Sequence, residues 1–216
     1  MTKKTSRELS LSDFVIPSPF DIRASSFGGR AAFTILELLI VITIIIALAG
    51  LILATVGYVQ KKGARSRAEA EMAGMSAALE SYKADNGIYP RDDAGNKYTD
   101  APDARSDGSA GSAYQRASQY VYGQLAGDPD FDGASNPNLK SYFTFKPQML
   151  FGPKDVNGNL TSVSYIRDPF GNSYGYSTIY QADPTKGYNP TFDLWSTGGV
   201  ISNANPPDQA QWIKNW

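Results

Sequence analysis

The stretch AAFTILELLIVITIIIALAGLILATVG, residues 31–57, decides the fold of this chain. It contains a single charged residue, Glu37, and no proline. A helix from Phe33 to Gly57 would be about 37 Å long, which exceeds the roughly 30 Å of a bilayer's hydrocarbon core. A core helix of a soluble domain is the alternative, but such helices rarely stay apolar on every face. The stretch therefore predicts a membrane span over residues 33–57.

Glu37 stands one turn inside this apolar stretch, where an ionised carboxylate is unfavourable unless it is paired. The surrounding sequence, RAAFTILELLIV at residues 30–41, resembles the processing site of type IV prepilins and type II secretion pseudopilins. The resemblance implies that a prepilin peptidase cuts between Ala32 and Phe33 and methylates the new N-terminus. It also implies that Glu37 pairs with the Phe33 amine of a neighbouring subunit. The family has Gly before the cut, where this chain has Ala32. The alternative role for Glu37 is that of a side chain that only extends from a helix end toward the membrane surface.

The residues that flank the span bear on its orientation. Residues 1–32 are basic, Ser-rich and Pro-containing, which predicts a disordered cytoplasmic leader. The resemblance implies that this leader is cleaved. A secretory signal peptide would carry its small residues after the apolar run rather than before it. Four basic residues also follow the span, so the positive-inside rule does not orient it: Lys61, Lys62, Arg65 and Arg67. The resemblance instead predicts a single-pass inner-membrane protein with its C-terminal head in the periplasm.

The composition excludes several kinds of chemistry. The chain has no Cys and no His, which removes disulfides, thiol nucleophiles, Ser-His dyads and His-ligated metals. Its net charge of −1 argues against a general electrostatic attraction to nucleic acid. The 13 Tyr and 20 Gly residues predict a Tyr-rich, turn-rich surface.

Residues 58–86 continue the helix in amphipathic form. Apolar residues fall at alternating spacings of four and three on one stripe: Ala68, Met72, Met75, Leu79 and Tyr82. One helix is therefore expected from Phe33 to Asp85, with Gly87 as its left-handed stop and Pro90 beyond it. The segment ESYKADNGIYP, residues 80–90, resembles the LYKxDNGxYP end of the pseudopilin helix.

Residues 87–216 are expected to form a globular head. We predict a mobile loop at 91–111, a second helix from Ala113 to Leu125, and strands at 142–146, 161–166, 174–180 and 191–195, with a turn at Asn157-Gly158. The predicted class is α+β, with the long helix packed on a small antiparallel sheet of three or four strands.

Two further segments resemble major pseudopilins. DPFGNSYGY, residues 168–176, is similar to their DPWGNPYxY turn and strand, which makes Asp168, Gly171 and Asn172 turn residues. FDLWSTG, residues 192–198, is similar to their YDLWSLG strand. The resemblance implies a type IV pilin-like fold in which residues 91–165 are a variable insertion. Trp212 is expected to pack on the sheet.

Two loops are candidates for Ca²⁺. Asp128, Asp130 and Asp132 open like an EF-hand loop, but Leu139 stands where the bidentate Glu is required. These three residues either bind Ca²⁺ together with backbone oxygens or form an ordinary solvated turn. Major pseudopilins also hold Ca²⁺ after the last strand. Here that loop, 197–208, has Gly199, Val200 and Ile201 in place of the acidic residues, and we do not expect a site there.

The leading functional hypothesis is a non-enzymatic subunit of a filament that drives type II secretion. The resemblance implies as partners further copies of the chain, minor pseudopilins, the prepilin peptidase, an inner-membrane assembly platform and, indirectly, a secretion ATPase. One alternative is a type IV pilin of an adhesive or DNA-uptake pilus, and another is a membrane-tethered module that binds glycans on a Tyr-rich face. The enzyme alternative would use paired carboxylates, either among Asp128, Asp130 and Asp132 or as Asp168 with Asp193.

Overall fold

The computed structural model describes residues 33–92, 95–108 and 110–216. The chain divides into two compact units, Met1–Gly50 and Leu51–Trp216. The predicted leader, residues 1–32, and with it Ala32 of the predicted processing site, lies outside the described residues.

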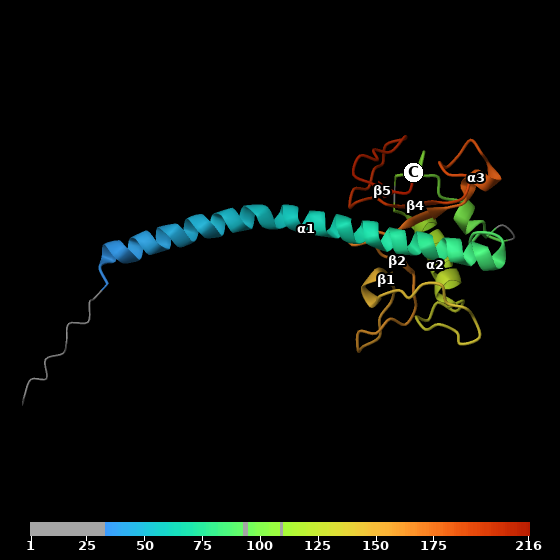
Figure 1. Ribbon diagram of the computed structural model, residues 1–216, viewed down its shortest axis with the longest axis horizontal. Coiled ribbons are helices and arrows are strands. Elements are labelled where there is room, and N and C mark those ends of the chain that lie inside the picture. Colours follow the sequence, from blue (N-terminus) through green and yellow to red (C-terminus); the bar gives the residue numbers. More distant parts are fainter. Residues whose placement is uncertain (1–32, 93–94, 109) are drawn as a thin grey trace, which may run out of the picture. The chain divides into compact units, whose positions relative to one another are not determined.

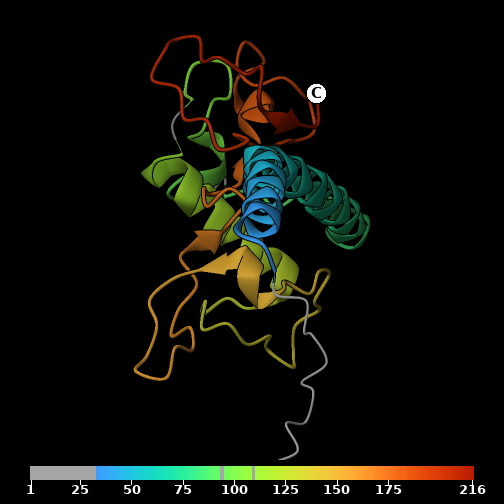
Figure 2. The ribbon, with the colours of Figure 1, turned by 90° about the vertical axis from the view of Figure 1, so that its left-hand side faces the viewer.

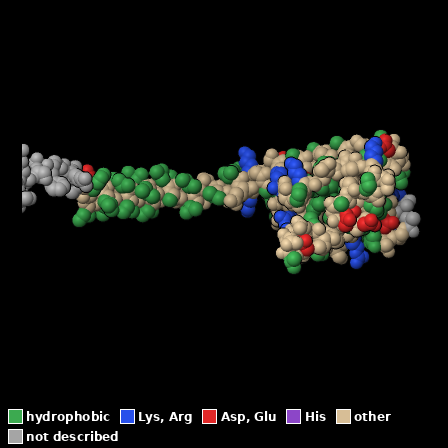
Figure 3. Space-filling view, turned by 90° about the horizontal axis from the view of Figure 1, so that it is seen from below, with side chains coloured by type: hydrophobic (Ala, Val, Ile, Leu, Met, Phe, Trp, Pro, Cys, Tyr) green, Lys and Arg blue, Asp and Glu red, His purple; other side chains and the backbone are tan. Residues whose placement is uncertain are grey.

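Helix α1 spans Ile35–Asn86 and continues from the first unit into the second (Figure 1). Within the described residues it is the one helix that is long and apolar enough to cross a membrane. Its large apolar side chains are exposed from Ile35 to Val59, and Figure 3 shows them covering this part of the helix. Thr43 is satisfied within the helix, because its hydroxyl donates a 2.8 Å hydrogen bond to the Leu39 carbonyl.

In the second unit, α1 buries the stripe that its sequence predicts. Ala68, Met72, Met75 and Leu79 are at most 5% exposed. They belong to one core cluster with Val121 and Leu125 of α2, which spans Ser112–Ala126. The predicted second helix is therefore confirmed to within one residue at each end.

Two small antiparallel sheets complete the head. The first has the order β3-β4-β5, formed by Gly175–Ser177, Asp193–Ser196 and Ile213–Lys214. The second pairs β1, Leu150–Phe151, with β2, Tyr165–Ile166. Figures 1 and 2 show the two sheets on opposite sides of the C-terminal part of α1. The α+β layout of a long N-terminal helix with small antiparallel sheets is confirmed.

Glycine allows the central strand to place its largest side chain. Gly175 of β3 pairs with Trp195 of β4, and a Cβ at Gly175 would lie 2.1 Å from the indole Cε2. The indole therefore occupies the space that any other residue at 175 would fill. Trp195 is fully buried and stacks on Trp212 with ring centroids 6.1 Å apart, so the expected packing of Trp212 on the sheet is confirmed.

Several predicted strands were wrong or too long. Residues 142–146 form no strand; instead the Tyr142 and Phe143 N–H groups both donate to the Leu125 carbonyl at the end of α2. The alternating aromatic residues there pack on the core from an irregular segment. The strand expected at 174–180 stops at Ser177, and the short helix α3 follows at Ile179–Ala182. The two-residue strands β1 and β5 are too short to leave an alternating pattern.

The segment predicted as a mobile loop makes specific contacts. It contains the 3-10 helix η1, Tyr98–Asp100, and buries Thr99 and Ala104 completely. A second 3-10 helix, η2, spans Pro147–Met149. Gly158 has φ of 85°, as the predicted turn requires.

The expected Tyr-rich surface is wrong, because tyrosines build much of the core. Tyr58 is 71% exposed, whereas six others are at most 9% exposed: Tyr89, Tyr114, Tyr122, Tyr165, Tyr174 and Tyr176. Five of these six hydroxyls donate hydrogen bonds to polar partners, those of Tyr89, Tyr114, Tyr122, Tyr174 and Tyr176; Tyr174, for example, donates to Glu71 at 2.8 Å. Burial of the rings is therefore compatible with hydrogen-bonded hydroxyl groups.

Candidate functional site

The N-terminus of α1 holds the predicted assembly residues. Phe33 is 83% exposed, and Glu37 is the third residue of the helix. The Glu37 carboxylate accepts hydrogen bonds from the Thr34 N–H at 2.9 Å and the Thr34 hydroxyl at 3.0 Å. In return, the Thr34 hydroxyl oxygen accepts from the Glu37 N–H at 3.2 Å.

This reciprocal pattern is a capping box, in which a Thr at the helix start and a Glu three residues later satisfy each other's backbone donors. It also places the carboxylate at the positive end of the helix dipole. Glu37 therefore has a partner within its own chain before any neighbour is present. The sequence analysis missed this role, although the T-x-x-E spacing at residues 34–37 is its signal.

The LYKxDNGxYP-like segment terminates α1 and ties it to the head. Gly87 has φ of 80° and its N–H donates to the Lys83 carbonyl at 2.7 Å. The Tyr89 hydroxyl donates to Glu80 at 2.9 Å, and its ring packs edge-on against Phe192. Pro90 is buried, and its carbonyl accepts from the Tyr176 hydroxyl at 2.9 Å. These residues have a structural role at the junction between helix and sheet.

The DPFGN segment forms a tight turn around a buried carboxylate. Asp168 accepts from the Phe170 N–H at 3.0 Å, the Asn172 N–H at 2.8 Å and the Ser196 hydroxyl at 2.5 Å. Gly171 supplies the positive φ, 99°, that the turn requires. The Asn172 amide in turn donates to the Thr197 hydroxyl at 3.0 Å. The turn thereby fixes the end of β4.

Asp168 and Asp193, which the enzyme alternative would pair, each accept hydrogen bonds from backbone N–H groups of a turn. Burial raises the pKa of Asp168 and also that of Asp193 above the usual range for a carboxyl group. The Asp193 carboxylate accepts from the Tyr188 and Asn189 N–H groups at 2.8 and 2.9 Å. The two carboxylates hold two different turns, and no hydrogen bond described in the structure joins them.

The Asp128 loop does not present a metal site as arranged. Asp128 is 1% exposed, and its carboxylate accepts from the Tyr122 hydroxyl at 2.8 Å and the Gly133 N–H at 2.9 Å. Asp132 accepts from the Ala134 N–H, and Asp130 is exposed. Among the residues that the structure describes, no three acidic side chains form a group that could hold a metal ion. These residues therefore do not fit Ca²⁺ in this arrangement, and its binding at Asp128, Asp130 and Asp132 stays a prediction.

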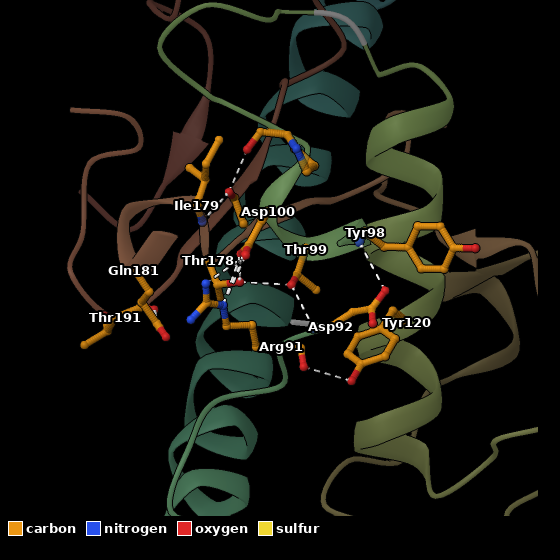
Figure 4. Close-up of polar contacts among 12 residues, drawn as sticks. Arg91, Asp92, Tyr98, Thr99, Asp100, Tyr120, Thr178, Ile179, Gln181 and Thr191 are labelled. Carbon is orange, nitrogen blue, oxygen red and sulfur yellow. Dashed lines mark hydrogen bonds and ion pairs between the residues drawn. The ribbon is translucent and has the colours of Figure 1, made fainter. Parts of the chain in front are cut away.

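A polar network that the sequence did not reveal fixes the segment around η1 (Figure 4). Arg91 forms an ion pair of 2.9 Å with Asp100, whose carboxylate also accepts from the Thr178 hydroxyl at 2.7 Å. The Thr178 hydroxyl lies 2.9 Å from that of Thr99, which is also the acceptor for the Asp92 N–H. The network joins the insertion to the end of β3, and every side chain named here is partnered. Thr178 is 78 residues from Asp100 and 79 from Thr99 in the sequence, so no local spacing predicts these contacts.

Comparisons with known proteins bear on this arrangement. No family model matches the chain, and no solved structure matches it. A similar curated protein is the type II secretion system core protein G of Aeromonas hydrophila, which is 34% identical over 82 residues. The match covers 36% of this chain and 57% of that protein, so the chain spans less than two thirds of its relative's length. The resemblance to type II secretion major pseudopilins that the sequence motifs carry is thereby confirmed.

Proposed function

We propose that this chain is a structural subunit of a pseudopilus, a filament that polymerises from the inner membrane and drives type II protein secretion. One observation carries the proposal: the first part of α1 is apolar on every face and uncovered, and its single acid stands four residues after Phe33. A helix of this kind requires either lipid or other apolar helices around it. The similarity to a type II secretion core protein supports the second of these surroundings as the final one.

In the membrane-inserted monomer, the capping box keeps Glu37 paired. Its carboxylate accepts hydrogen bonds from Thr34 at the helix start. The helix dipole favours a negative charge there, and the nearby headgroup layer keeps the carboxylate out of the centre of the bilayer. Cleavage before Phe33 would create a new amine on the residue that directly precedes this box, four residues before Glu37. Thr34 would then be the second residue of the mature chain.

In the filament, we propose that Glu37 exchanges its Thr34 bonds for the Phe33 amine of a neighbouring subunit. Packing of the uncovered apolar side chains supplies cohesion, and the charge pair fixes the axial position of each subunit relative to the next. The prepilin peptidase, minor pseudopilins, the assembly platform and the secretion ATPase are the partners that this function requires.

The test separates helix capping from charge pairing. Gln retains the capping-box geometry but carries no charge. We therefore expect Glu37→Gln to insert in the membrane with normal helicity, yet to lower the yield of sheared filaments as strongly as Glu37→Ala. Filament yield is measured by shearing and immunoblotting, and membrane insertion by carbonate extraction.

The matched control removes the capping partner and keeps the charge. Thr34→Val should shorten or fray the first turn of α1 while leaving most filament assembly intact. Normal filaments from Glu37→Gln, together with defective filaments from Thr34→Val, would assign Glu37 to capping alone. An unprocessed N-terminus in mass spectra of the cellular protein would remove the amine on which the proposal depends.

A further inference from the structure

A groove of about 820 Å³ lies in the second unit, beside the residues that follow the apolar stretch. Tyr58, Lys61, Lys62 and Arg65 of α1 form one side of it, and Phe170 and Val200 contribute to the other. None of the residues that line it is acidic. Figure 3 shows Lys and Arg side chains gathered along α1 just beyond its apolar part.

The three cations of the groove differ in their partners. Arg65 pairs with Glu69 at 3.2 Å and donates to the Gln211 carbonyl at 3.0 Å, so it is held against the head and its charge is partly compensated. Lys61 and Lys62 are exposed, and the ion pairs found among the described residues include neither of them. The groove therefore presents two ammonium groups without an ion-pair partner among the described residues, and one guanidinium that is held by Glu69 and the Gln211 carbonyl.

The opposite wall depends on a glycine turn. Gly198 has φ of 62°, and a Cβ there would lie 2.2 Å from the Gln211 carbonyl oxygen. Only glycine brings the turn this close to the segment that binds Arg65. Val200, which lies two residues after Gly198, is 41% exposed, so this side of the groove presents an apolar surface opposite the basic side formed by α1.

The position of the groove along the helix matches a particular depth in a membrane. The apolar stretch ends at Gly57, and Lys61 follows it by about 6 Å of helix rise. The polar layer of a bilayer is roughly 5–8 Å thick on each side of its hydrocarbon core. Tyr58, which is 71% exposed, is also of the residue type that lies at this boundary.

We propose that this groove binds the phosphate of an anionic phospholipid headgroup from the leaflet that surrounds the end of the span. Lys61 and Lys62 bind the phosphate oxygens, while Tyr58 and Val200 contact the glycerol and upper acyl carbons. The chain has a net charge of −1, so the attraction comes from these local cations rather than from the whole protein. The inference rests on the membrane-inserted state in the proposed function and does not require the filament.

The test measures lipid preference in the full chain. Monomeric protein is reconstituted into phosphatidylcholine vesicles that contain traces of spin-labelled phosphatidylglycerol or spin-labelled phosphatidylcholine. The immobilised fraction of each label, read by electron spin resonance, gives the relative association constant. We expect a severalfold preference for phosphatidylglycerol and a loss of about fivefold in that preference in Lys61→Gln/Lys62→Gln. In 1 M NaCl, where the Debye length is about 3 Å, the preference of the unmodified chain should also disappear.

The matched control is Lys146→Gln/Lys154→Gln, which removes the same charge from exposed lysines outside the groove and should keep the preference. The preference should also persist in Glu37→Ala, so a failure of the filament proposal would leave this one standing. Equal association of both lipids with the unmodified chain would overturn the inference. It would be overturned equally if the lysine variant kept its lipid preference but lost filaments, because the groove would then receive another subunit.

Discussion

The two parts of α1 are one helix made for two different surroundings. From Ile35 to Val59 its apolar side chains point in every direction and are exposed. From Ala68 to Leu79 apolar side chains form one stripe, and the head covers that stripe almost completely. The backbone is helical in both parts, so the difference lies only in the pattern of side chains.

The comparison teaches that exposure has a different meaning in each part. In the second part, burial of a narrow stripe supplies the tertiary stability of the head. In the first part, the same residue types contribute nothing to the fold of the single chain. Their stabilisation comes from lipid or from neighbouring helices. Changes that affect the head should therefore leave the first part helical, and changes in the first part should leave the head folded.

The largest expected contrast is in alkaline solution. Burial raises the pKa of Tyr114, Tyr174 and Tyr176 above the usual value for a phenol, and the Glu71 charge raises that of Tyr174 further. The unfolded chain releases these protons from about pH 10 while the folded head retains them. The stability that they contribute is thus complete below pH 10 and falls as the pH rises above it. At pH 11 the three groups together should lower the unfolding free energy by about 4 kcal/mol.

This loss is measured on the full chain in detergent micelles by near-ultraviolet circular dichroism, with tyrosinate absorbance at 295 nm recorded in parallel. The head signal should disappear together with the cooperative part of the tyrosinate signal, which comes from the buried tyrosines, while helicity from the apolar part remains. Tyr174→Phe should reduce the steepness of the transition. If all of the tyrosinate signal formed gradually while the head structure remained, the buried tyrosines would not be coupled to folding.

The next contrast compares the same substitution in both parts. Leu79 is fully buried, whereas Leu51 is 68% exposed. We expect Leu79→Ala to lower the unfolding free energy of the head by about 3 kcal/mol, through lost apolar burial and the remaining cavity. Leu51→Ala should leave it unchanged. Denaturant titrations of the full chain in micelles, followed by near-ultraviolet signals, would contradict the comparison if both variants lost stability equally.

The sequence predicted the helices better than the strands for a physical reason. The stripe from Ala68 to Tyr82 repeats a helical period over four turns, and Gly87 ends it with a distinct backbone requirement. The strands of the head have two to four residues, and β4 is buried at every position, so neither length nor alternation identifies them. Segment 142–146 misled the prediction in the opposite way. Its pattern of aromatic residues resembles that of a strand, but these residues pack on the core from a loop.

The candidate sites also differ in how well the sequence predicts them: sites within one short segment are predictable, and sites assembled from distant segments are not. The turn residues Asp168, Gly171 and Asn172 lie together because a single local motif contains all of them. The basic groove combines Lys61 and Arg65 with Gly198, which is more than 130 residues away in the sequence, so only the folded head brings them together. The three aspartates at 128–132 show that local spacing alone does not decide where carboxylates point, because Asp128 turns inward to Tyr122.

A smaller effect is expected from a pair of Asp-centred turns. The buried Asp168 carboxylate accepts two backbone N–H groups, and the exposed Asp155 carboxylate accepts the Asn157 and Asn159 N–H groups at 2.9 and 2.8 Å. Asp168→Ala leaves the buried Ser196 hydroxyl and two partly buried N–H groups without their acceptor and should lower head stability by about 2 kcal/mol. In Asp155→Ala, water replaces the carboxylate, and the change should stay within about 0.5 kcal/mol. If both variants lost the same stability in thermal unfolding, burial of the Asp168 carboxylate would not increase its contribution to stability.

The smallest predicted effect lies at the uncovered end of α1. Thr34→Val removes the hydroxyl that accepts the Glu37 N–H and donates to its carboxylate, which should weaken the first turn by about 1 kcal/mol. Thr43→Val is the matched control, because that hydroxyl bonds to the Leu39 carbonyl in mid-helix and caps no donor. Hydrogen exchange in micelles should show about fivefold faster exchange in the first turn of the Thr34 variant only, with head amides unchanged in both. Faster exchange in the head would mean that the two parts of α1 are coupled through the helix, and that the first part helps to stabilise the fold of the single chain after all.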